Sequence, residues 1–216
     1  MNKNKKTNNK VNKKKVTDIL NILDVLYPYD HTCFLHYSKP WQLLIATILS
    51  AQCTDERVNS VTAVLFEKYP DLADFAFADY SALAKDIHST GFFRTKARNI
   101  IESAKILLAD YHGQLPSDIE ALTSLPGVGR KTANVVRGHI FNIPSIVVDT
   151  HVKRVSHRLG LTSSLDPEKA EYELMKILPK SHWIAYNQQV ITHGRKICSS
   201  RNPKCALCPL VVRCVF

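Results

Sequence analysis

Hydrophobic residues recur at helical spacing along most of this chain. The clearest case is a stretch at residues 94–112, where one helix face collects Ala97, Ile100, Ile101, Ala104, Leu108 and Tyr111. Gly113 follows this stretch, as a glycine often does just after a helix ends. Residues 40–52 are hydrophobic around nearly the whole helical circumference, which predicts a buried, central helix.

Polar residues mark where several of the other helices begin. Ser117 and Glu120 form the pattern of a capping box, and Asp149 and the pair Asp166–Pro167 are placed to cap two later helices. Only residues 146–148 have the pattern of a strand, and this segment is too short to build a sheet. The predicted fold is therefore all-α, with helices at about residues 16–27, 40–52, 58–66, 80–88, 94–112, 117–125, 130–140, 150–159, 167–178 and 183–193.

Residues 125–136 read LPGVGRKTANVV and predict two helices joined by a tight hairpin. A Pro-Gly pair ends the first helix, and Gly129 can take a positive φ and leaves room for close approach to the backbone. The second helix begins at Arg130, and its first amides form an anion site that suits a DNA phosphate. Taken alone, the pattern fits an ordinary helix-turn-helix with a surface lysine, Lys131, equally well.

Positive charge is concentrated at both ends of the chain. The net charge is +10, yet residues 1–15 hold seven lysines and residues 194–216 hold five Lys or Arg, with no acid in either segment. The remaining residues carry a net charge of −2. Such basic ends predict a polyanionic partner. Residues 1–15 have almost no hydrophobic residue and are predicted to be disordered, and this tail would also fit a purely solubilising role.

The sequence contains no recognisable export or membrane segment. Asp18 and Asp24 interrupt the residues after the lysine run, so no secretory signal forms there. The most hydrophobic run, residues 41–51, is too short to span a bilayer and includes Gln42 and Thr47. We therefore expect a cytoplasmic protein that has no membrane partner.

Four of the six cysteines lie close together near the C-terminus, with the spacing C-x6-C-x2-C-x5-C: Cys198, Cys205, Cys208 and Cys214. In a cytoplasmic protein such a group indicates metal ligands rather than disulfides. Four thiolates suit zinc and an iron–sulfur cluster alike, so the chemistry of the residues leaves both open. Cys33 and Cys53 fit no metal spacing and are expected to be buried small hydrophobic residues.

The hairpin, the Val-Asp-Thr-His stretch at residues 148–151 and the cysteine group together resemble the endonuclease III family of helix-hairpin-helix DNA glycosylases. The resemblance extends over roughly residues 16–216. It implies two lobes, a helical barrel at 34–143 that contains the hairpin, and an iron–sulfur domain made from 16–33 and 144–216. It places the active site in the cleft between them.

The same resemblance implies which residues bind the cluster and the DNA backbone. The four grouped cysteines would hold one [4Fe–4S] cluster with a mainly structural role. Lys196, Arg201 and Lys204 would lie in the cluster loop and face DNA phosphates. The hairpin would bind DNA through Gly127, Gly129, Arg130 and Thr132.

The resemblance assigns the chemistry to Lys131 and Asp149. A flipped nucleotide would expose its C1′ atom, which Lys131 would attack as a neutral amine to form a Schiff base with the opened sugar. The helix N-terminus disfavours a charged amine at that place. β-Elimination would then nick the strand 3′ of the abasic site. Asp149 would steady positive charge on the sugar and help move protons, whereas a plain helix cap would do neither.

Two further residues are expected to enter the DNA. Gln52 matches the family loop whose glutamine fills the space left by the flipped base. Phe92 follows Gly91 where the family has a wedge, although an aliphatic wedge is more usual there. The alternatives are a polar helix-end residue for Gln52 and ordinary core packing for Phe92.

The predicted protein is thus a bifunctional DNA glycosylase and AP lyase of base excision repair. Its expected partner is double-stranded DNA with oxidised pyrimidines or abasic sites, bound by a nucleoid-associated monomer. One alternative is a monofunctional mismatch glycosylase, which would lack Lys131. Another is a non-catalytic iron–sulfur protein that binds DNA or carries electrons, which would not need Lys131 and Asp149 together.

Overall fold

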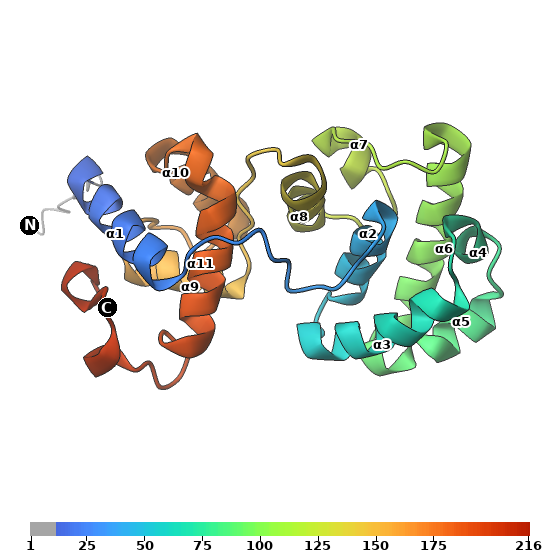
Figure 1. Ribbon diagram of the computed structural model, residues 1–216, viewed down its shortest axis with the longest axis horizontal. Coiled ribbons are helices and arrows are strands. Elements are labelled where there is room, and N and C mark those ends of the chain that lie inside the picture. Colours follow the sequence, from blue (N-terminus) through green and yellow to red (C-terminus); the bar gives the residue numbers. More distant parts are fainter. Residues whose placement is uncertain (1–11) are drawn as a thin grey trace, which may run out of the picture. The chain divides into compact units, whose positions relative to one another are not determined.

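All regular secondary structure in the described chain is helical, which confirms the all-α prediction (Figure 1). The computed structural model describes residues 12–216. The predicted strand at 146–148 is wrong, because these residues lie in irregular structure. The elements are α1 (Lys13–Leu26), α2 (Pro40–Leu49), α3 (Asp55–Lys68), α4 (Leu72–Ala76), α5 (Tyr80–Asp86), η1 (His88–Thr90), α6 (Phe93–Tyr111), α7 (Ile119–Thr123), α8 (Arg130–Phe141), α9 (Thr150–Arg158), α10 (Pro167–Ile177), η2 (Lys180–His182), α11 (Trp183–Lys196), η3 (Cys205–Leu207) and η4 (Val211–Arg213).

The described residues form two compact units. One unit is residues 31–145, and the other combines residues up to 30 with residues 146–216. Each unit has its own cluster of buried hydrophobic side chains. Helix α1 and the C-terminal residues therefore belong to the same unit, and the hairpin belongs to the other.

Helix α2 is the centre of the 31–145 unit. Every residue from Trp41 to Leu49 is buried, as the hydrophobic circumference of this segment predicted. The Trp41 ring packs edge to face against Phe66 of α3 and Phe75 of α4, with centroids 5.7 Å and 5.6 Å away. Helices α3, α6 and α8 also contact α2, so the hairpin helix α8 is anchored on the core.

Helix α11 is the centre of the other unit, where it packs against α9 and α1. The buried amide of Gln189 donates to the Asp24 carboxylate at 2.7 Å and to the Tyr27 carbonyl at 3.2 Å, which ties α11 to α1. The buried hydroxyl of Tyr186 lies 2.7 Å from the Ser156 hydroxyl of α9. The contact between Tyr186 and Ser156 holds α11 against α9, and Asp149 immediately precedes α9.

Two local predictions are wrong by a few residues. Helix α1 begins at Lys13, where Asn12 accepts a bond from the Lys14 amide at 2.9 Å, so the predicted disordered tail extends too far. Residues 1–11 of that tail lie outside the described part. Helix α7 is capped by Asp118, which accepts from the Ala121 amide at 2.9 Å, and not by Ser117. A helix that starts one residue later places the carboxylate at the capping position.

The five-residue helix α4 was not predicted, because one turn is too short to show a period. No helix within residues 12–216 combines the length and the hydrophobicity that crossing a membrane requires.

Candidate active site and DNA interface

The hairpin between α7 and α8 depends on two glycines with different roles. Gly127 has φ +79°, and a Cβ atom there would lie 2.6 Å from the Asn99 amide nitrogen of α6. Gly129 is extended at φ −89°, so the left-handed conformation is at Gly127 and not at Gly129. A Cβ atom on Gly129 would meet nothing within 4 Å. The open side of the hairpin at Gly129 therefore leaves room for a ligand to approach the backbone.

Lys131 is exposed on the first turn of α8. This turn contains no acidic residue, and it carries Arg130 and Lys131 at the end of the helix that is already partly positive. The first amides of an α-helix also have no partner within the helix. The combination is a cationic helix end suited to an anion. Thr132 is buried, so its side chain offers little surface to DNA.

Asp149 caps α9, as the sequence predicted. Its carboxylate accepts a hydrogen bond from the Val152 amide at 2.7 Å, and the residue is half-buried. Lys131 lies in the 31–145 unit and Asp149 in the other. The cleft that would bring the two together stays a prediction.

A histidine in the first turn of α9 affects the electrostatics around Asp149. Burial lowers the pKa of His151, and the positive charges of Arg154 and Arg195 lower it further, while the Asp149 carboxylate acts in the opposite direction. Its Nδ1 lies 3.2 Å from an Arg154 nitrogen. A neutral imidazole leaves the negative charge of Asp149 largely uncompensated from this side.

Two arginines of α9, which sequence reasoning missed, bind the cysteine loop. Arg154 donates to the Cys198 carbonyl at 2.9 Å and 3.1 Å. Arg158 donates to the Ser199 carbonyl at 2.7 Å and to the Ser200 carbonyl at 3.0 Å. Their spacing of four residues, which places them on one helix face, was the only available signal. These hydrogen bonds attach α9, which Asp149 caps, to the start of the segment that carries the four grouped cysteines.

The four grouped cysteines line one cavity of about 70 Å³, together with residues that include Arg158 and Phe216. Arg158 donates to the Cys198 sulfur at 3.3 Å, and the Cys208 sulfur lies 3.5 Å from His193 Nε2. Burial raises the pKa of the Cys208 thiol, and the negative charges of the other three cysteines raise it further. Thiolates packed this closely need a positive partner. Within residues 12–216 no group of three or more Cys, His, Asp or Glu side chains is arranged around a single metal ion.

The three basic residues near the cysteines that are predicted to face DNA are exposed. Arg201 and Lys204 lie in the loop between Cys198 and Cys205. Lys196 is instead the last residue of α11, where its ammonium group lies 5.8 Å from the centroid of the Tyr27 ring. The predicted position of Lys196 in the loop is therefore wrong.

Cys33 and Cys53, which were expected to be buried, are half-buried and pack on the core of the 31–145 unit. Burial raises the pKa of the Cys33 thiol to about 11.

Gln52 and Phe92 are both exposed and both have a left-handed backbone. Gln52 has φ +54° and Phe92 has φ +48°, which is uncommon for residues with a side chain. The Phe92 side chain is 66% exposed, so the alternative that it packs in the core is wrong. Strained, exposed residues of this kind concentrate at functional sites.

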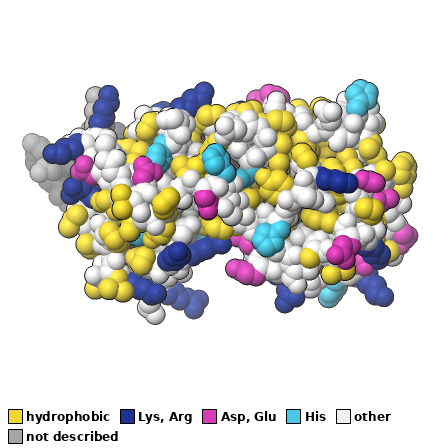
Figure 2. All heavy atoms as spheres, viewed as in Figure 1, with side chains coloured by type: hydrophobic (Ala, Val, Ile, Leu, Met, Phe, Trp, Pro, Cys, Tyr) yellow, Lys and Arg dark blue, Asp and Glu magenta, His cyan; other side chains and the backbone are white. Residues whose placement is uncertain are grey.

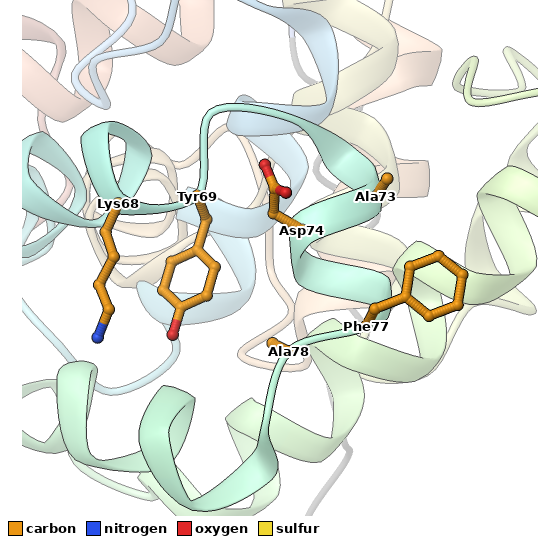
Figure 3. A pocket seen from close by; sticks show the side chains of 6 residues that line it. All are labelled: Lys68, Tyr69, Ala73, Asp74, Phe77 and Ala78. Carbon is orange, nitrogen blue, oxygen red and sulfur yellow. The ribbon is translucent and has the colours of Figure 1, made fainter.

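Another hollow of the described surface lies away from the predicted site residues. A hollow of about 370 Å³ lies between α3 and α4, lined by residues that include Lys68, Tyr69 and Phe77 (Figure 3). None of the predicted site residues lines it. On the face drawn in Figure 2, basic side chains lie in small groups among acidic and hydrophobic ones. Charge alone therefore does not mark a DNA surface on that face.

Comparison with known proteins relates this site to DNA repair. Residues 45–180 match the model of the HhH-GPD superfamily of base excision DNA repair proteins. Endonuclease III of Synechocystis sp. is 50% identical over 94% of this chain and 92% of its own length, and that of Bacillus subtilis is 42% identical over 94% and 93%. A trapped endonuclease III–DNA covalent intermediate superposes with a TM-score of 0.89 at 43% identity, covering 95% of this chain and 96% of that one.

Proposed function

Since this chain belongs to the endonuclease III family, within the HhH-GPD superfamily of base excision DNA repair proteins, we propose that Lys131 and Asp149 carry out its reaction on DNA. The chain is a DNA glycosylase and AP lyase. The observation that carries the assignment of the nucleophile is the exposed amine of Lys131 on the first turn of α8. A solved member of the family has been trapped in a covalent complex with DNA, and such a complex requires a nucleophile of this kind.

The proposed substrate is duplex DNA that contains an oxidised pyrimidine or an abasic site, bound by a monomer in the cytoplasm. Its phosphates would lie on the open side of Gly129 and the cationic end of α8, where Gly127 shapes the turn and Arg130 adds charge. At Thr132 the backbone amide, rather than the buried side chain, would face the phosphate. Lys196, Arg201 and Lys204 would meet the backbone further along.

The reaction follows from the chemistry of the Lys131 amine. The amine would attack in its neutral form, because only that form has a free lone pair. The nitrogen lone pair forms a bond to C1′ of the flipped nucleotide as the bond from C1′ to the base breaks, and the base leaves with a proton. Opening of the sugar ring produces a Schiff base. Loss of a C2′ proton then expels the 3′ phosphate, and water releases the product from Lys131.

Asp149 supports this sequence through its charge. The Val152 amide at the start of α9 holds the carboxylate in place, and its charge would stabilise the positive charge that develops on the sugar as the base departs. The same group can take the proton that moves during ring opening. The role of the charge can be tested separately from capping, because asparagine caps a helix nearly as well but carries no charge.

We also propose that Cys198, Cys205, Cys208 and Cys214 hold one [4Fe–4S] cluster. All four thiols line one cavity, and four cysteine thiolates are the usual ligands of such a cluster. When bound, the cluster supplies a rigid cross-link for the loop. Arg154 and Arg158 bind the same loop from α9, so the cluster and the helix of Asp149 share a support.

Cys208→Ser should remove iron and acid-labile sulfide from the purified protein and abolish its visible absorption, because a serine hydroxyl cannot replace the thiolate ligand. Metal analysis and the absorption spectrum measure this. Cys53→Ser is the matched control, since Cys53 lies in the other unit and should retain the full iron content. Zinc without iron or sulfide in the native protein would contradict the proposed cluster.

Borohydride trapping tests the proposed function as a whole. The protein should release the base from duplex DNA that contains thymine glycol, nick the strand without added metal or nucleotide, and form a covalent adduct under borohydride. Undamaged duplex is the control. Base release without nicking or trapping would identify a monofunctional glycosylase. Binding with no base release would identify a non-catalytic protein.

A further inference from the structure

A buried lysine that the reaction does not use connects the two loops that are expected to enter DNA. Lys96 lies in the first turns of α6 and is 4% exposed. Its ammonium group donates to the Leu49 carbonyl at 2.7 Å and to the Thr90 carbonyl at 2.8 Å. We define the filler loop as residues 50–54, which contain Gln52, and the wedge loop as residues 88–92, which end in Phe92.

We propose that Lys96 is a positioning residue that holds the filler loop and the wedge loop in one fixed arrangement, so that Gln52 and Phe92 enter the DNA together. The inference rests on the proposed roles of Gln52 and Phe92. It adds a residue that touches neither the DNA nor the reacting atoms.

The two carbonyls bound by Lys96 are both at the C-terminal ends of helical segments. Leu49 is the last residue of α2, and Thr90 is the last residue of η1. Carbonyls at helix ends lack partners within the helix and carry partial negative charge. A single ammonium group therefore satisfies two helix ends that lie 41 positions apart in the sequence but meet at one point in the fold.

These contacts lie close to the strained residues. Leu49 precedes Gln52 by three residues, and Thr90 precedes Phe92 by two. The Lys96 backbone amide also donates to the Phe92 carbonyl at 3.0 Å. Gln52 and Phe92 both have a positive φ, so neither residue continues the helical segment that precedes it. The bonds from the Lys96 side chain restrain the backbone just before each of them, in addition to local turn bonds.

A charge at this depth is costly to keep. Burial lowers the pKa of the Lys96 ammonium group, because the protein removes water from it. A methionine would fill the same space and pack without this cost, since unpaired buried charge is unfavourable and thioethers suit core gaps. Core packing alone does not explain a lysine here, whereas directional bonding of two loop ends does.

The test compares Lys96→Met with Lys105→Met, a control on the same helix that removes the same charge from an exposed position. A Gln52→Ala/Phe92→Ala double variant shows what complete loss of loop function looks like. Each protein is assayed by single-turnover base release from a thymine glycol duplex and by nicking of a preformed abasic site. Fluorescence of 2-aminopurine, placed opposite a stable abasic analogue, reports how far the bound protein unstacks the opposite strand.

Lys96→Met should slow base release by roughly tenfold to hundredfold, the range expected when positioning is lost, and should leave nicking of the abasic site within about twofold. It should also lower the 2-aminopurine signal to that of the double variant, and adding it to the double variant should cause no further loss. Lys105→Met should match the wild type.

Circular dichroism identifies a temperature at which every variant is folded. If Lys96→Met does not fold, Lys96→Gln replaces it, because the glutamine amide can still donate to one of the two carbonyls.

Three outcomes would overturn the inference, and they differ from one another. If the double variant loses 2-aminopurine signal and base release while Lys96→Met and Lys96→Gln keep both, Lys96 does not position the loops. Equal losses on both substrates would show that Lys96 only stabilises the fold. If the double variant itself behaves as the wild type, the proposed roles of Gln52 and Phe92 fail, and the inference fails with them.

Discussion

Lys131→Gln should abolish borohydride trapping and strand nicking on thymine glycol DNA, with a loss of roughly 10⁴-fold or more, as expected when a covalent nucleophile is removed. Glutamine keeps the length and polarity of the side chain but has no nucleophilic amine. Because Lys131 is exposed on the first turn of α8, the substitution removes no core contact, and the variant should still fold and bind the lesion duplex. Gel-resolved nicking, trapping and a binding assay measure the three effects.

Two further variants separate nucleophilicity from charge. Lys131→Arg keeps the positive charge but stays protonated, so it should bind DNA as the wild type does and remain inactive. Lys105→Gln removes an exposed lysine of α6 and should remain fully active. If Lys131→Gln still forms the trapped adduct at the wild-type rate, another amine is the nucleophile and the mechanism proposed for Lys131 is wrong.

Asp149→Asn should slow base release by about 10²-fold or more, the range associated with loss of a positioned acid–base group. Asparagine is as good a helix cap as aspartate, so the Val152 amide keeps its partner and the melting temperature should hardly change. Asp149→Ala should lose the same activity and, in addition, about 1 kcal/mol of stability, because it also removes the cap. Single-turnover kinetics and thermal melts measure the two effects separately.

Asp166→Asn is the matched control for this substitution. Asp166 caps α10 in the same unit and accepts from the Lys169 amide at 2.9 Å, so the chemical change is identical at the same helix position. It should leave both base release and stability unchanged. Wild-type rates for Asp149→Asn would show that Asp149 is a helix cap and nothing more.

Local signals were sufficient for most of the helices and for the candidate nucleophile. The hydrophobic spacing of residues 94–112 predicted α6 to within one residue at each end, and the aspartates at 149 and 166 cap helices where the sequence placed them. These features depend on residues three or four positions apart, whose interactions form within a single helix. The resemblance behind the assignment of Lys131 likewise rested on short motifs, namely the hairpin, residues 148–151 and the cysteine group.

Long-range packing decided the features that the sequence described wrongly. The sequence allowed a positive φ at Gly129, but the positive φ is at Gly127, where Asn99 of α6 leaves no room for a Cβ atom, and Gly129 is extended. For Phe92 the sequence left ordinary core packing open as an alternative. In the structure this side chain is exposed and follows the turn at Gly91. In both cases the deciding neighbour is set by how separate helices pack, which no local pattern records.

The sequence by itself determined the all-α class, the positions of the main helices, the hairpin with Lys131 and the grouping of the four cysteines. Only the tertiary structure placed those cysteines around one cavity, fastened Arg154 and Arg158 of α9 to the loop between them, and buried Lys96 between the ends of α2 and η1. The physical reason is the range of the interactions. Helix formation and capping are satisfied within a few residues, whereas a buried ammonium group or a shared cavity requires partners that only the folded chain brings together.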